Sequence, residues 1–137
     1  MVVVTIIGLL AALAVPALQR VQRSAQNSRF ASDLRIYAQA FETYALENGN
    51  WPPNDLSGRI PASLAGDIAS KFTERNSLGG LWNWDTNRLG ISGGIATTGV
   101  TVSAIQMAKV DALIDDGDVT SGAFRLFGSR YILVLEE

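Results

Sequence analysis

Two residue types that carry much of enzyme and metal chemistry are missing from this 137-residue sequence, which has no cysteine and no histidine. Without cysteine, the chain can form neither disulfides nor thiolate metal sites. Without histidine, it lacks the commonest general base and zinc ligand. It also has no Gly-x-Ser-x-Gly and no P-loop, and the glycines of residues 90–94 lack the strand–turn–helix context of a dinucleotide site. We therefore expect no catalytic activity.

Charge is missing from residues 1–18, and the first ionisable side chain is Arg20. As a helix, this run would rise about 27 Å, close to the roughly 30 Å thickness of the hydrocarbon core of a bilayer. Backbone groups in lipid must be satisfied internally, which favours a helix. The run predicts a membrane-spanning segment attached to a soluble part of about 110 residues, enough for one modest core.

Three interpretations of this apolar run stay open at this point. A secretory signal peptide would be cleaved near Ala12-Leu13-Ala14, although no basic residue precedes the run. A plain single-span anchor is the second, and the positive-inside rule, taken literally, would then hold the soluble part in the cytoplasm through the arginines that follow. The third is an assembly helix, and it depends on what comes next in the chain.

The residues after the run continue the helix without a break. Residues 21–48 contain neither glycine nor proline, and their apolar members form a one-sided helical stripe: Phe30, Leu34, Tyr37, Ala38, Phe41, Tyr44 and Ala45. Asn48-Gly49 suits a left-handed cap, and Trp51-Pro52-Pro53 prevents the helix from resuming. The sequence therefore predicts one helix of nearly fifty residues, bent or loosened at Pro16.

The segment from Val2 to Pro16, VVVTIIGLLAALAVP, resembles the N-terminal helix of type IV pilins and type II secretion pseudopilins. Gly8 and Pro16 stand where that family usually has glycine and proline. In the family, a prepilin peptidase cuts after the glycine of a short basic leader and methylates the new N-terminus, which opens a Phe-Thr-Leu-Ile-Glu-Leu-like stretch. The resemblance aligns Met1 with the residue after this glutamate, so we expect the leader and the first mature residues upstream of Met1.

This resemblance implies an α+β pilin fold, with the long helix packed on a small antiparallel sheet of about four strands. It divides the chain into a hydrophobic membrane and assembly half at residues 1–29 and a globular head at residues 30–137. The implied function is a structural subunit of a type IV pilus-like filament or type II secretion pseudopilus. Such a subunit would polymerise with itself and with other pilin-like subunits through the N-terminal helix.

The resemblance also implies a location. The subunit would lie in the bacterial inner membrane with a periplasmic head before assembly, and in a periplasmic or extracellular filament afterwards. The alternative is a single-span membrane protein whose soluble head binds a ligand, a carbohydrate or a protein partner. A net charge of −2 gives no general attraction for nucleic acid.

Two sets of residues carry these expectations. The membrane and assembly set includes small residues that allow helices to approach closely, and consists of Val4, Ile7, Gly8, Leu10, Ala11, Ala14 and Pro16. The set that packs the helix against the head is Phe30, Leu34, Tyr37, Phe41 and Tyr44.

The rest of the head predicts short elements, taken here in chain order. We expect a helix at Pro61–Phe72, strands at Leu81–Asp85 and Leu89–Ala96 around a turn at residues 86–88, a helix at Ser103–Ile114, and a final hairpin of Ala123–Phe127 and Arg130–Glu136. The stripe of the second short helix would be Ile105, Ala108 and Ala112, with Met107, Val110 and Ile114 nearby. Trp82 and Trp84 share one strand face, where covering a helix is favoured over a carbohydrate platform.

Charge is unevenly distributed along the chain. Between Arg20 and Arg35 four arginines face one acid, whereas from Asp111 onward six acids face two arginines. A positive base and a negative C-terminal end suit repeated subunits that stack base against head. An ordinary solvated surface is the alternative.

An acidic cluster of Asp111, Asp115, Asp116 and Asp118 is the one constellation with metal-like character. It does not match an EF-hand, so we expect no cofactor and a solvated acidic turn. The alternative is calcium at Asp115, Asp116 and Asp118, which the resemblance favours because some major pseudopilins bind calcium in a loop near the end of the chain.

Overall fold

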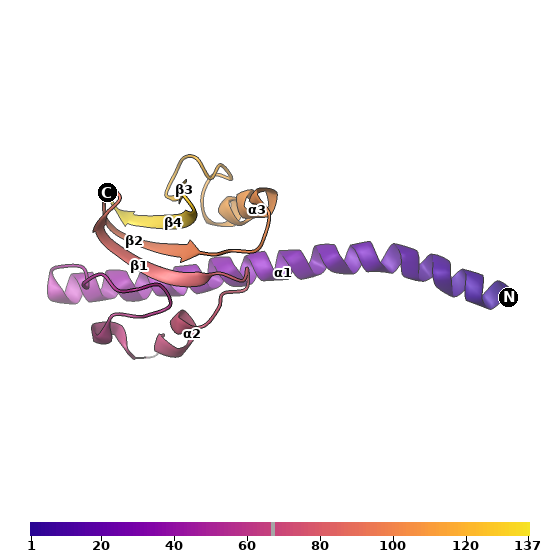
Figure 1. Cartoon of the computed structure of the whole chain (residues 1–137), viewed down its shortest axis with the longest axis horizontal. Coiled ribbons are helices and arrows are strands. Elements are labelled where there is room, and N and C mark those ends of the chain that lie inside the picture. Colours follow the sequence, from indigo (N-terminus) through magenta and orange to yellow (C-terminus); the bar gives the residue numbers. More distant parts are fainter. Residues whose placement is uncertain (67) are drawn as a thin grey trace.

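One long helix dominates the computed structural model, which describes residues 1–66 and 68–137. Helix α1 (Val2–Asn48) has 47 residues, a length of about 70 Å at 1.5 Å per residue. It ends where Gly49 adopts a left-handed conformation (φ 73°) and donates its amide to the carbonyl of Ala45. Figure 1 shows the C-terminal half of α1 lying along the head and the N-terminal half projecting from it. The predicted long helix and its cap are confirmed.

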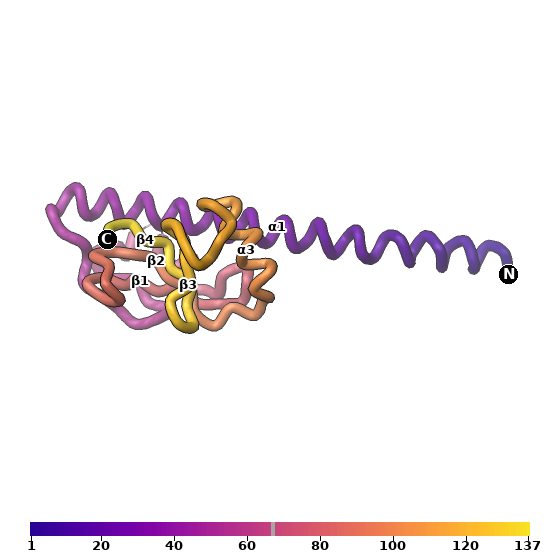
Figure 2. The backbone as a smooth tube through the Cα atoms, turned by 90° about the horizontal axis from the view of Figure 1, so that it is seen from above, coloured from indigo at the N-terminus to yellow at the C-terminus, as the bar shows by residue number. Residues whose placement is uncertain are grey.

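Pro16 lies inside α1 and does not end it. Proline has no amide hydrogen, and its ring crowds the carbonyl four residues earlier, so it bends a helix more often than it breaks it when the neighbouring turns are sound. The projecting half curves gently toward its N-terminus in Figure 1 and stays one continuous helix in Figure 2.

Four strands form a single antiparallel sheet with the order β1-β2-β4-β3. The strands are β1 (Leu81–Arg88), β2 (Ile91–Thr98), β3 (Phe124–Phe127) and β4 (Arg130–Glu136). They make two hairpins, β1–β2 and β3–β4, which are joined by the pairing of β2 with β4. A long helix on a four-stranded antiparallel sheet confirms the predicted α+β, pilin-like arrangement.

An aromatic layer joins α1 to the sheet. Phe30 stacks on Trp82 with ring centroids 4.7 Å apart, and Phe41 stacks on Trp84 at 4.0 Å. Tyr37 meets Trp82 edge-on, with centroids 5.2 Å apart. These five side chains are at most 2% exposed. Because each large apolar side chain contributes about 1.5–3 kcal/mol when fully buried, this layer supplies much of the stability of the head.

The remaining residues of the stripe on α1 follow the same face. Leu34 is buried, whereas Tyr44 is only half-buried near the end of the helix. The indole of Trp84 donates a hydrogen bond to the carbonyl of Pro52 at 2.9 Å, so its polar atom is satisfied inside the core. Both tryptophans of β1 are therefore covered, and the alternative of an exposed carbohydrate platform is wrong.

Two predictions about the first part of the head are wrong in detail. The helix expected at Pro61–Phe72 is instead a 3₁₀ turn, η1 (Ala62–Leu64), and a short helix, α2 (Ala69–Thr73). Gly66 lies between them and favours a break because glycine loses the most entropy in a helix; Asp67 lies outside the described residues. The turn expected at residues 86–88 is at Leu89-Gly90, where both residues have positive φ, as a two-residue hairpin requires.

Helix α3 (Ala104–Ile114) begins at Ser103, whose hydroxyl accepts a hydrogen bond from the amide of Gln106. Its buried face differs from the predicted stripe. Ile105 is 74% exposed, whereas Met107 and Val110 are completely buried. Apolar residues occur on several faces of α3, so periodicity alone does not predict which face is buried. The buried face is determined by packing against α1 and β3.

The aromatic layer yields a direct test of what holds the head together. We expect Phe41→Ala to lower the free energy of unfolding by about 3–5 kcal/mol, because it removes a completely buried ring from a stacked pair. Denaturant titration of the full chain in detergent, followed by tryptophan fluorescence, measures this. Leu46→Ala is the matched control, since Leu46 is on the same helix but 86% exposed, and should change the free energy by less than about 0.5 kcal/mol. Equal losses in the two variants would contradict the assignment.

Candidate functional site

The stem, defined here as residues 1–26, is the part of α1 that leaves the head. All of its residues are exposed. Within the predicted membrane and assembly set, Val4, Ile7 and Leu10 are 71%, 61% and 62% exposed. A side chain added at Gly8 would meet no atom within 4 Å. Continuous apolar surface of this extent is rare on a soluble monomer, so the stem is a surface for lipid or for protein.

The stem is the one helical segment within residues 1–66 and 68–137 that is long and apolar enough to cross a membrane, and none of its apolar window is buried in the molecule. The helix enters the head at Asn27, the first buried residue of α1. Gln106 donates a side-chain hydrogen bond to the Asn27 side chain at 2.9 Å, and the Ser77 hydroxyl donates to the carbonyl of Gln26 at 2.8 Å. Since no linker intervenes, these contacts fix the direction of the stem.

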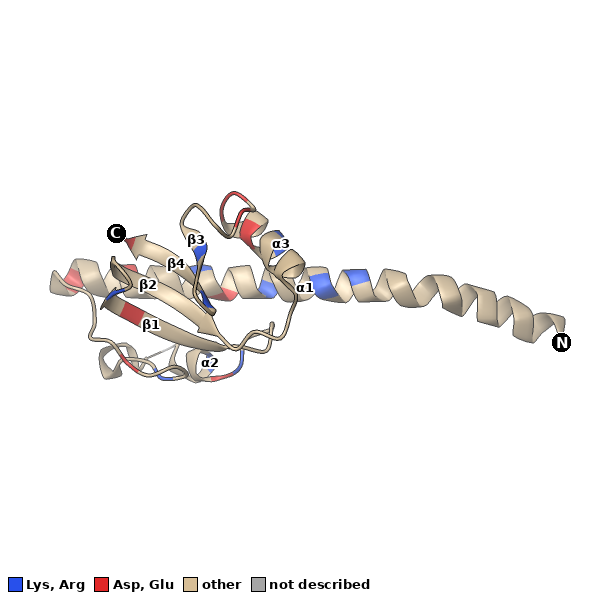
Figure 3. Ribbon diagram, turned by 45° about the horizontal axis from the view of Figure 1, so that its top comes forward, with Lys and Arg blue, Asp and Glu red and all other residues tan. Residues whose placement is uncertain are grey.

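A groove between α1 and α3 lies at the base of the head, and we call it the basal groove. Its cationic lining residues are Arg20, Arg23 and Lys109, and its lining includes no acidic residue. Two exposed apolar side chains, Ile105 and Leu113, also line it. Figure 3 shows basic residues on α1 where it meets α3.

A second groove, the distal groove, lies at the opposite end of the head beside the last turn of α1. It is lined by Glu42, Leu46, Trp51 and Glu136 among others, and its lining includes no basic residue. The indole of Trp51 donates a hydrogen bond to the carboxylate of Glu136. Leu46 projects from this end with 86% of its surface exposed. The linings of the two grooves therefore carry charges of opposite sign, and both linings include exposed apolar side chains.

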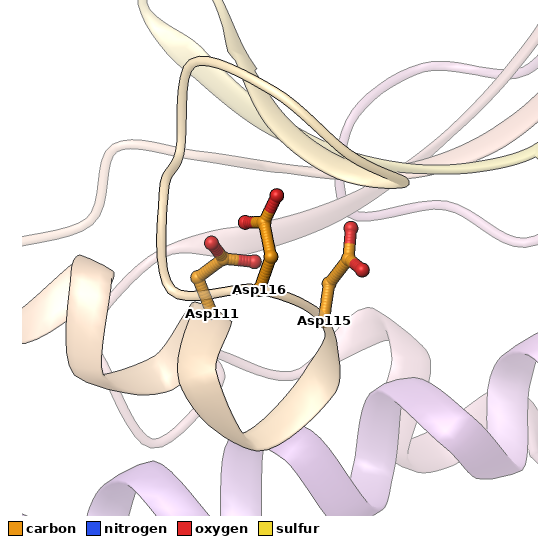
Figure 4. A group of neighbouring side chains, drawn as sticks. All are labelled: Asp111, Asp115 and Asp116. Carbon is orange, nitrogen blue, oxygen red and sulfur yellow. The ribbon is translucent and has the colours of Figure 1, made fainter.

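The acidic loop, residues 111–123, comprises the last turn of α3 and the connection to β3. One oxygen from each of Asp111, Asp115 and Asp116 lies within 4.8 Å of the other two, as Figure 4 shows for the side chains. The amide of Asp118 donates to Asp116 Oδ1 at 2.8 Å. This hydrogen bond holds the exposed carboxylate of Asp116 close to the end of α3.

Electrostatics differ sharply between these acids. Burial, followed by the neighbouring carboxylates of Asp116 and Asp115, raises the pKa of Asp111 to about 6. The pKa of Asp116 is lowered because the Asp118 amide and the Ser121 hydroxyl donate hydrogen bonds to it. The fold therefore disfavours the ionised form of Asp111 and favours the ionised form of Asp116.

The structure regroups the acids that the sequence singled out. Asp118 turns to Thr120, whose hydroxyl and amide donate to its carboxylate at 2.6 and 3.0 Å. Asp111 joins Asp115 and Asp116 in its place. A spacing of four residues between Asp111 and Asp115 puts them one helical turn apart, which is the signal that could have found this pairing.

A buried ion pair in the sheet was missed by sequence reasoning. Asp85 on β1 is completely buried, and its carboxylate lies 3.0 Å from the Arg130 guanidinium and 3.8 Å from that of Arg88. The contact with Arg130 ties the edge strand β1 to β4 across the sheet, so we assign Asp85 to the stability of the head.

Comparisons with known proteins find relatives over about half of the chain. A type IV major pilin protein PilE1 of Neisseria gonorrhoeae is 36% identical over 74 residues, which are 54% of this chain and 44% of the relative. A fimbrial protein of Neisseria meningitidis is 35% identical over 74 residues and 42% of its own length. The chain thus spans less than half the length of these relatives. No protein-family model and no solved structure matches the chain.

Because residues 1–25 are exposed and make no hydrogen bond or ion pair with the described part of the head, a fragment of residues 26–137 should be a soluble, folded monomer. We expect its thermal midpoint to lie within about 3 °C of that of the head in the full chain, measured by circular dichroism with light scattering for the mass. A fragment of residues 34–137 is the matched control: it loses Phe30 from the aromatic layer and should be less stable by about 3 kcal/mol or more. Aggregation of the longer fragment would show that the stem supports the head.

Proposed function

We propose that the chain is a member of the type IV pilin family and a structural subunit of a type IV pilus-like filament or of a related secretion pseudopilus. The observation that carries this proposal is the stem, an exposed apolar half-helix that continues without a linker into a folded head. A molecule built this way can move its stem from one apolar environment to another without refolding the head.

Lipid is the first of these environments in our proposal. The stem would lie in the bacterial inner membrane with the head in the periplasm, because its backbone groups are satisfied within the helix and its side chains are apolar. Arg20 and Arg23 follow the apolar run directly, at the level where long cationic side chains reach the lipid headgroups.

Other stems are the second environment. Leaving the membrane costs each stem its apolar contacts, and bundling with the stems of neighbouring copies restores them and excludes water. The small residues Gly8, Ala11, Ala12 and Ala14 let helix backbones come close, which strengthens van der Waals packing between them. The membrane would thus contain the unassembled subunits from which the filament grows.

Contacts between heads would give the polymer two different ends. The basal groove is cationic and the distal groove is anionic, and they lie at opposite ends of one head. Two different, complementary surfaces on one molecule form a head-to-tail contact, which extends into a helical polymer when the rotation does not close. We propose that the basal groove of one copy meets the distal groove of another.

The alternative function, a single-span membrane protein with a ligand-binding head, uses the stem only as an anchor. It therefore tolerates any stem substitution that preserves insertion into the membrane. The two functions differ most clearly in what happens when a small stem residue becomes a large apolar one.

Stem substitutions test assembly directly. We expect Leu10→Arg, like Ile7→Arg, to abolish filaments while the head still folds, since a buried arginine costs about 2.5–3.5 kcal/mol even at the centre of a bilayer. Gly8→Leu keeps the run apolar, and a Cβ at this position faces open space, yet the variant should also reduce filaments because it holds neighbouring stems apart. Filaments sheared from cells are quantified alongside membrane-inserted protein, with Ile7→Leu as the neutral control.

Normal filament amounts from both Leu10→Arg and Gly8→Leu would rule out polymerisation through the stem. Loss of filaments from Gly8→Leu with full membrane insertion would exclude the anchor-only alternative.

Charge exchange tests the contact between heads. We expect Arg23→Glu and Glu42→Arg each to reduce filament yield roughly tenfold, because like charges would then face each other across the contact. The double variant should recover most of the yield, since the pair is restored with its charges exchanged. Glu74→Arg makes the same charge change on an exposed residue outside both grooves and is the control. A double variant as poor as the singles would refute the pairing of the grooves.

A further inference from the structure

We propose that the basal groove binds the phosphate of one anionic phospholipid while the stem lies in the membrane. The ligand class is a phosphodiester lipid with a net negative charge, such as phosphatidylglycerol. This inference rests on the membrane location of the stem in the proposed function, and it concerns the subunit before assembly. The same groove would meet the distal groove of another copy only after the lipid has left.

The position of the basal groove matches the headgroup layer of a bilayer. The apolar run ends at Leu18, and at about 1.5 Å per residue Arg20 and Arg23 follow roughly 3 Å and 7–8 Å farther along α1. The polar layer on each side of the hydrocarbon core is about 5–8 Å thick. With residues 1–18 in the core, both guanidinium groups would therefore lie at the depth of the lipid phosphates.

Three cations line this groove and have no partners of their own. Arg20 and Arg23 come from α1 and Lys109 from α3, and all three are exposed. The side-chain ion pairs formed within residues 1–66 and 68–137 involve none of them. The arginines of the strands differ, because each is paired with a carboxylate: Arg88, Arg125 and Arg130. An anion from outside the chain would supply the partner that the groove lacks.

Neutral donors add to the lining. Asn27 is its one buried residue, at 6% exposure, and its side-chain oxygen accepts a hydrogen bond from Gln106 at 2.9 Å. Its amide nitrogen is left as a donor on the buried side of the groove. The Ser24 hydroxyl and the first turn of α3, where the helix dipole is positive, also line the groove. Charged and amide donors of this kind are the groups that bind phosphate oxygens in proteins.

The lining also distinguishes between possible ligands. It contains no acidic residue, so the ammonium group of a zwitterionic lipid would find like charges and no carboxylate. Ile105 lies beside the cations and is 74% exposed. Apolar side chains next to lysine and arginine are typical of helices that lie in a membrane interface. A free phosphate ion would make no use of this apolar surface, whereas a lipid would.

Native mass spectrometry of the full chain in dodecyl maltoside tests this site, with dioleoyl phosphatidylglycerol and dioleoyl phosphatidylcholine as probes. We expect one phosphatidylglycerol per chain, bound about tenfold or more tightly than phosphatidylcholine, because the net negative charge of the lipid is matched by three cations. Sodium phosphate and glycerol 3-phosphate at roughly 10 mM should displace less than half of the bound lipid, since neither has acyl chains to bury.

Substitutions separate a defined site from diffuse attraction. Arg23→Gln and Lys109→Gln should each weaken phosphatidylglycerol binding about tenfold, because each removes a charged donor from the lining. Lys109→Arg keeps the charge and should stay within about threefold of the wild type. Arg29→Gln is the matched control: it removes the same charge from an exposed part of α1 outside the groove, and should also stay within about threefold.

The role of Lys109 is the sharpest part of the test. Arginines that merely follow a membrane span would contact headgroups without help from α3, so Lys109→Gln would then have no effect. Because the substituted side chains are exposed, each variant should unfold within about 2 °C of the wild type, measured by circular dichroism without lipid.

Four results would overturn the proposal. They are equal affinities for the two lipids, complete displacement of the lipid by inorganic phosphate, equal losses in Arg29→Gln and Lys109→Gln, and dimers that bind no lipid, which would assign the groove to another head alone. Membrane insertion and filament yield of the wild type are measured in cells in parallel. A chain that inserts and forms filaments without preferring phosphatidylglycerol overturns this inference alone, whereas a chain absent from the membrane overturns the proposed function with it.

Discussion

The contact between the aromatic side chains of α1 and the two tryptophans of β1 is the interaction on which the rest of the structure depends. Most of the stability of a helix in a protein comes from packing of one face rather than from propensity, and the second half of α1 is fixed because Phe30 and Phe41 stack on Trp82 and Trp84. The sheet depends on the helix in turn, since a four-stranded sheet needs one face covered. Neither layer has a core without the other.

That contact also determines how the two ends of the molecule are oriented. Because α1 passes from the head into the stem without a loop, the direction of the stem is set by the same residues that build the core. A flexible linker would let every subunit hold its head at a different angle. A continuous helix gives all copies one shape, which is the condition for identical contacts to repeat along a polymer.

Much of this architecture could be predicted from sequence because it depends on local signals of high contrast. Absence of charge in the first eighteen residues, a one-sided stripe from Phe30 onward and the cap at Gly49 all predict the same structure, a long helix that ends at Gly49. The errors occur where tertiary contacts decide between similar options, as in α3, whose buried face is selected by its neighbours. The burial of Asp85 and Asp111 also escapes sequence reasoning, because a carboxylate is expected at the surface until the partner that buries it is known.

Helix α3 connects the proposed contact between heads with the acidic loop. Its exposed face contributes Ile105 and Lys109 to the basal groove, and its last turn contributes Asp111 to the acidic loop. The Arg35 guanidinium donates a hydrogen bond to the carbonyl of Leu113, which ties the end of α3 to α1. This hydrogen bond fixes that end of α3, and with it the position of the residues that line the groove. The proposed contact between heads thus depends on the placement of one short helix, because α3 supplies part of the lining of the basal groove.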